Sequence, residues 1–154
     1  MSESHITEAW AIHDRINRYL LAAIPEEALT AVSASKGRTV AEQFAHMHNV
    51  RLMWLKAALP ELLTGLTKLE KTGLGRKSLN TELERSGAAI AKLLEESAAN
   101  ADRIKGFKPH GTAFFAYLVS QESHHRGQIL LTLKQAGFPV DKKFSYGIWE
   151  WGVR

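Results

Sequence analysis

Two histidines and one glutamine are spaced so that they could bind a single divalent metal ion. Gln121 and His125 are four residues apart, and residues i and i+4 stack one turn apart on a helix. His46 lies in the middle of another predicted helix, and helical bundles build metal sites from side chains on facing helices. The face of Gln121 and His125 is otherwise apolar, through Phe114, Leu118, Ile129 and Leu133.

Two imidazoles and an amide oxygen would form one face of a divalent-metal site, with the other positions left to water or substrate. Imidazole suits zinc, nickel, cobalt or iron, whereas a glutamine oxygen is a weaker and harder ligand. A water molecule on such an ion becomes a nucleophile or base near neutral pH. The same residues also allow a metal-free polar core in which Gln121 hydrogen bonds to one histidine, because an unpaired buried amide is costly.

The neighbouring polar residues are expected to lie outside this site. His124 is predicted at a rim or interface, Glu122 should point away from the site, and His48 falls on another helical face from His46. Arg126 and Gln128 fit either a supporting or a surface position. The histidines predicted at the surface are His5, His13 and His110, and the residues predicted in the core are Met47, Met53 and Trp54.

Four long amphipathic helices and no β-rich segment predict an all-α four-helix bundle that forms one domain over residues 1–154. Thr39 and Glu42 have the spacing of a capping box, and Thr112 is the predicted N-cap of the fourth helix. Single helical turns are expected near Glu26–Leu29 and Glu61–Thr64. The predicted long helices run from about Glu3 or Thr7 to Ala23, from Thr39 to Ala58, from Ser78 or Asn80 to Ala99, and from Thr112 to Ala136.

The composition is that of an ordinary globular protein, with 154 residues and a net charge of +4. The absence of cysteine excludes thiolate metal sites and fits a cytoplasmic protein. No apolar run reaches the length of a membrane span, and no signal peptide is expected. A loose basic cluster is predicted to be a solvated loop, so a nucleic-acid partner is not expected: Lys68, Lys71, Arg76 and Lys77.

The end of the chain is rich in large apolar residues, which a solvated tail would not carry. We expect it to pack back on the domain or on another subunit. The residues concerned are Phe144, Tyr146, Ile148, Trp149 and Trp151.

Three runs resemble the DinB-like (DinB/YfiT) family, and the resemblance extends over nearly the whole chain. They are residues 39–46 (TVAEQFAH), 124–129 (HHRGQI) and 148–152 (IWEWG). The resemblance implies a four-helix bundle, often homodimeric, whose usual metal ligands are one histidine of the second helix and a His-x-x-x-His pair of the fourth. His46 and His125 match the first and last of these ligands, and Gln121 replaces the middle one.

With this replacement, three possibilities remain open: a weaker metal site, a changed metal preference or an empty polar pocket. With a metal, which we expect to be zinc or nickel, the resemblance implies a thiol-dependent transferase or a hydrolase that acts on a small molecule. The alternative is a non-catalytic bundle that binds a small molecule or a partner through a metal-free His/Gln pocket.

Overall fold

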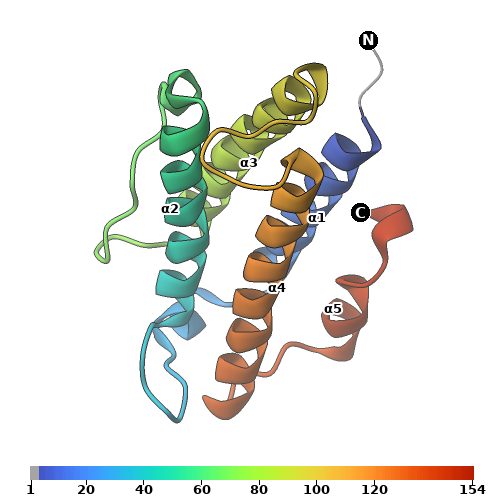
Figure 1. Cartoon of the computed structure of the whole chain (residues 1–154). Helices are drawn as coiled ribbons and strands as arrows, with labels where there is room; N and C mark the ends of the chain where they lie inside the picture. The colour runs from blue at the N-terminus through green and yellow to red at the C-terminus, as the bar shows by residue number, and fades with distance from the viewer. Residues whose placement is uncertain (1–3) are drawn as a thin grey trace.

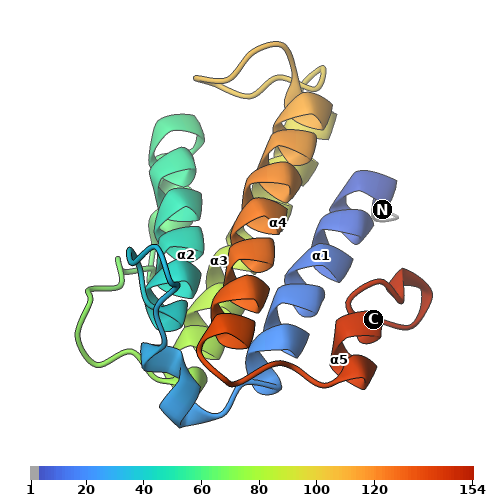
Figure 2. The same cartoon turned by 90° about the horizontal axis from the view of Figure 1, so that it is seen from below.

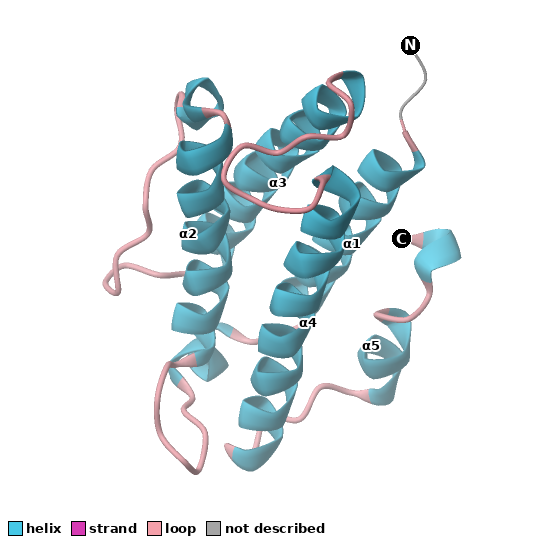
Figure 3. Ribbon diagram, in the orientation of Figure 1, coloured by secondary structure: helices cyan, strands magenta, loops and turns pink. Residues whose placement is uncertain are grey.

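Four long helices form a bundle in the computed structural model, which describes residues 4–154 (Figure 1). They are α1 (His5–Ala22), α2 (Val40–Ala58), α3 (Arg76–Ala99) and α4 (Gly111–Gln135). The shorter helices are η1 (Glu26–Thr30), η2 (Pro60–Leu63), α5 (Lys142–Gly147) and η3 (Trp151–Val153). Figure 3 shows helices and loops but no strand in the described part of the chain, so the predicted all-α bundle is confirmed.

The helix ends follow local capping chemistry. The Thr39 hydroxyl accepts a hydrogen bond from the Glu42 amide at 3.1 Å, and the Glu42 carboxylate accepts one from the Thr39 amide at 3.0 Å. The predicted N-cap of α4 is wrong: His110 caps this helix by accepting from the Ala113 amide. Thr112 is not the cap because its own amide and hydroxyl both donate to Asp102 in the preceding loop.

The core consists of two apolar clusters with a polar layer between them. The first cluster contains Ile16, Met47, Leu83 and Ile129, and the second contains Trp10, Leu55, Ile90 and Leu118. In each long helix a buried polar residue lies between these positions in the sequence: His13 in α1, Arg51 in α2, Ser86 in α3 and Glu122 in α4. All four helices therefore contribute to one polar layer that crosses the bundle.

We predict that Gly87→Ala destabilises the protein, because the Asp14 side chain occupies the volume that a side chain at position 87 would need. A Cβ atom at position 87 would lie 2.6 Å from the Asp14 Cγ atom. Overpacking of this kind costs about 1–3 kcal/mol, which exceeds the helix propensity gained, about 1 kcal/mol. Thermal unfolding should show a lower Tm. Gly127→Ala is the control, since outside its own helix backbone and chain neighbours no described atom lies within 4 Å of a Cβ there. An equal loss in both variants would contradict the steric explanation.

The C-terminal tail packs back on the domain beside α1. The Phe144 ring lies 5.1 Å from the Tyr19 ring, and the Arg154 guanidinium lies 3.9 Å above the same tyrosine. Ile148 is buried, so the prediction for this part of the tail is confirmed, whereas Trp149 is exposed. Figure 2 shows α5 next to α1, on the opposite side of the bundle from α2. Trp149 thus leaves an exposed aromatic side chain two residues after the end of α5.

No helix among residues 4–154 is long and apolar enough to cross a membrane.

Candidate metal centre

His46 of α2 and His125 of α4 lie in direct contact across the two helices. Their ring centroids are 4.7 Å apart and the rings meet edge to face at 73°. Two imidazoles bound tetrahedrally to one ion at about 2.1 Å would have centroids roughly 5 Å apart. The observed separation therefore suits a shared ion, although an edge-to-face aromatic contact has a similar distance. His46 is partly exposed and His125 is buried, so the pair is reached from the His46 side.

Gln43 fixes the orientation of the His125 ring. Nδ1 of His125 lies 2.7 Å from Oε1 of Gln43, and because an amide oxygen only accepts, Nδ1 carries the proton. The lone pair is then on Nε2. Gln43 is itself held by Gln128, whose Oε1 accepts from Gln43 Nε2 at 3.2 Å. This is the arrangement in which a supporting residue directs a metal-ligating imidazole, although sequence reasoning did not identify Gln43.

Both histidines are uncharged near neutral pH, as metal ligation requires. Burial, with the neighbouring His46 and His124, lowers the pKa of His125 to about 4. Burial and the charge of Arg38 lower the pKa of His46.

Gln121 contributes an oxygen atom that has no hydrogen-bond partner. Its Oε1 is buried and unpaired within the described part of the chain, one helical turn before His125. Leaving such an oxygen unpaired costs about 1–3 kcal/mol, and a cation beside it would remove that cost. His46, Gln121 and His125 therefore offer donor atoms of the types that suit a divalent ion. Over residues 4–154 no three histidine or carboxylate side chains gather around a metal-sized space, so the site depends on this amide.

We predict that Gln43→Leu weakens metal binding by about 10–100-fold, the usual effect of losing a residue that orients a ligand. The reason is that the His125 ring loses the acceptor that keeps its proton on Nδ1. The measurement is a zinc titration in competition with a chromophoric chelator. Gln135→Leu serves as the control, because the hydrogen bond of that side chain within the described residues is to the Ala34 amide, away from His125 in the sequence of α4. Equal affinities of Gln43→Leu and the unmodified protein would contradict the role of Gln43.

Glu122 accepts four hydrogen bonds in the buried polar layer. Arg51 of α2 donates to both carboxylate oxygens, from Nε and Nη2, at 2.8 Å each. His13 and Asn17 of α1 each lie 3.0 Å from Oε1. The prediction that His13 lies at the surface is wrong, because its side chain is fully buried against Glu122 and packs on Trp10. Its place three residues after Trp10 and three before Ile16 was the signal that could have shown this.

Further charges complete the layer. Asp14 lies 2.9 Å from Arg51 Nη1 and 3.0 Å from Arg18 Nε, and Arg126 donates to Asn17 Oδ1 at 2.8 Å. Burial alone would raise the pKa of Glu122, but the charge and hydrogen bonds of Arg51, with His13, lower it to about 2. Burial would likewise lower the pKa of Arg51, and its two carboxylate partners raise it overall. Glu122 and Arg126 directly follow Gln121 and His125 in α4, so the bonds of the polar layer fix where these two candidate ligands lie.

Three further sequence predictions concern residues of α2. Met53 was expected in the core, and this is wrong: 57% of it is exposed, because it lies on the outer face of α2. His48 is buried and hydrogen bonds to Ser86 and to the Thr67 carbonyl, so it lies on another helical face from His46, as predicted, and takes no part in the histidine pair. Trp54 is partly buried in an aromatic cluster with Phe107, Phe114 and Tyr117.

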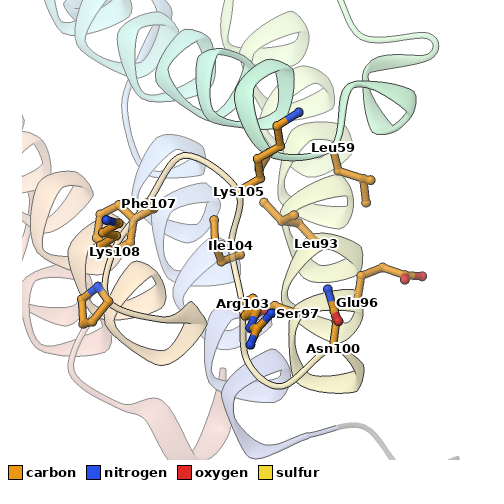
Figure 4. Close-up of a pocket in the computed structure, with 12 residues that line it drawn as sticks. Leu59, Leu93, Glu96, Ser97, Asn100, Arg103, Ile104, Lys105, Phe107 and Lys108 are labelled. Carbon is orange, nitrogen blue, oxygen red and sulfur yellow. The ribbon is translucent and has the colours of Figure 1, made fainter.

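A separate cavity of about 690 Å³ lies where the 100–110 loop meets the ends of α2 and α3 (Figure 4). Its apolar floor includes Leu59, Leu93 and Ile104, and Arg103, Lys105 and Lys108 lie around it. None of the three candidate metal ligands lines this cavity. It is therefore distinct from the histidine pair.

The chain is thus an all-α helical bundle with a histidine pair between its second and fourth long helices. The model of the DinB family matches residues 1–144, and the chain belongs to the DinB family. The resemblance seen in the sequence is thereby confirmed. None of the curated proteins compared with the chain matched it.

Proposed function

We propose that the protein binds one divalent metal ion through His46, Gln121 and His125 and acts on a small molecule as a metal-dependent transferase or hydrolase. The buried Oε1 of Gln121, which has no partner among the described residues and lies one helical turn before His125, carries this proposal together with the two uncharged imidazoles. Zinc or nickel is the expected ion, because imidazole ligands suit both. We further propose that the protein is a homodimer in the cytoplasm.

The residues around the proposed site would differ in their roles. Gln43 keeps the proton of His125 on Nδ1, so that Nε2 is free to bind. His46 is partly exposed and leaves the site open to a substrate from solvent. The Glu122–Arg51 pair holds α4 against α2, which keeps the two histidines at one distance. A bound divalent ion would supply a Lewis acid that polarises a substrate oxygen or lowers the pKa of a thiol.

The second candidate is a non-catalytic bundle with a metal-free pocket. The edge-to-face contact of His46 with His125 favours it, since this packing and the bond to Gln43 partly satisfy the rings without an ion. It does not account for the unpaired oxygen of Gln121.

Thermal unfolding with added zinc or nickel, and with EDTA, tests the proposal. An ion that binds only the folded state, at a free concentration of 100 times its Kd, adds about 2.7 kcal/mol to the free energy of unfolding. The Tm should therefore rise by several degrees, and EDTA should return it to the metal-free value. His125→Ala should lose the shift. His124→Ala is the control, because His124 is the exposed neighbour of His125. An unmodified protein whose Tm does not respond to any of these ions supports the metal-free candidate instead.

A further inference from the structure

A groove of about 590 Å³ runs along the outer face of α2 and includes His46. One wall is α2 itself, and the other is formed by η2 and the segment after it, through Leu63, Leu66 and Lys68. A volume of this size lies in the range of small-molecule sites, which are mostly apolar with a few polar groups. Since His46 belongs to both places, the groove leads to the candidate metal centre.

The second wall of the groove is fixed in place by α2. The side chain of Asn49 donates through Nδ2 to the Leu69 backbone carbonyl and accepts through Oδ1 from the Leu69 backbone N–H, both at 2.9 Å. One residue earlier, His48 Nε2 lies 2.9 Å from the Thr67 carbonyl oxygen. These bonds hold the segment 67–69 against the helix. The groove is therefore already formed before a ligand arrives, which lowers the entropy cost of binding.

The chemistry of the groove points to an apolar chain with a negative charge. Its apolar lining consists of Val50, Leu52, Met53, Leu63 and Leu66. Its charged lining residues are Lys56 and Lys68, and no aspartate or glutamate of the described chain lines it. Neither lysine forms an ion pair with another residue of the described chain. An ammonium at the edge of an apolar surface attracts an anion, and nothing in the groove opposes one.

We propose that this groove binds the aliphatic chain of an amphipathic carboxylate. Lys56 lies ten residues after His46 on α2, which corresponds to about 15 Å along the helix. A carboxylate near Lys56 would thus place the other end of an extended chain beside His46. The substrate of the site would then be an aliphatic carboxylate whose other end carries the group that reacts beside His46, and only this link to His46 rests on the proposed metal-dependent function.

The test uses decanoate and protein carrying ¹³C-methyl methionine. Met53 lines the groove and Met47 is fully buried in the core, so the two methyl signals provide the readout and its internal control. We expect decanoate to shift the Met53 signal saturably and to leave the Met47 signal in place. Decyltrimethylammonium, with the same chain and a positive charge, should bind at least about tenfold more weakly. Equal binding of the two amphiphiles, or no saturable Met53 shift, overturns the proposal.

Two charge variants then locate the binding site, with decanoate followed by calorimetry. Met53→Glu places a negative charge in the groove and should weaken binding at least about tenfold. Leu131→Glu is the matched control, because Leu131 is similarly exposed, at 54%, on α4 outside the groove; an equal loss in both variants overturns the proposal. Metal binding is measured separately without decanoate. If decanoate binds but zinc and nickel do not, the proposed metal-dependent function is wrong and the groove proposal stands. If a metal binds but decanoate does not, the groove proposal is wrong and the metal site stands.

Discussion

Glu122→Ala is expected to lower the free energy of unfolding by about 3–5 kcal/mol, the usual cost of removing one partner of a buried ion pair. The reason is that Arg51, fully buried, loses both of its short bonds to this carboxylate and keeps, within residues 4–154, only Asp14 as a charged partner. His13 and Asn17 lose an acceptor at the same time. Urea unfolding of the metal-free protein followed by circular dichroism measures the change.

The control for this variant is Glu84→Ala. Glu84 is 62% exposed and lies 3.8 Å from Arg18, so its removal should cost less than about 1 kcal/mol. A Glu122→Ala variant as stable as Glu84→Ala would contradict the description of the polar layer as a structural element that connects all four helices.

Gln121→His is expected to raise the affinity for zinc and nickel at least about tenfold, because a neutral imidazole binds these ions better than an amide oxygen does. The change also produces the two-histidine spacing in α4 that the DinB-like resemblance implies for the usual metal site. Since the Gln121 Oε1 forms no hydrogen bond with any residue that the structure describes, little stability should be lost. Competition titrations with a chromophoric chelator give the two Kd values.

Ser120→His is the matched control for the gain in affinity. It adds a histidine to the same helix at an exposed neighbouring position, where it should leave the affinity unchanged. If Gln121→His binds no tighter than Ser120→His, position 121 does not face the ion.

The bundle was predictable because its signals are local. Thr39 and Glu42 determine the start of α2 through bonds between residues three apart, and the apolar spacing around Leu118 and Ile129 predicts a buried face of α4. The meeting of His46 with His125 followed from the same spacing, together with the family resemblance. The N-cap of α4 was missed because Asp102, ten residues away, binds the Thr112 amide.

The polar layer was not predictable in the same way, because its partners come from different helices. Glu122 and Arg51 are 71 residues apart, and a sequence shows two charged residues without showing that they neutralise each other in the core. An isolated buried charge is costly, so each residue taken alone is expected in solvent. Met53 was misplaced for the opposite reason: an apolar side chain was expected inside, whereas the structure places it at a groove.

The metal content of tag-free protein purified without chelator tests the central claim most directly. Elemental analysis should find about one zinc or nickel ion per chain in the unmodified protein and in His124→Ala, and almost none in His46→Ala and His125→Ala. Unmodified protein that holds no metal, even after incubation with zinc and nickel, would contradict the metal site. The same is true of bound metal that survives the loss of both His46 and His125.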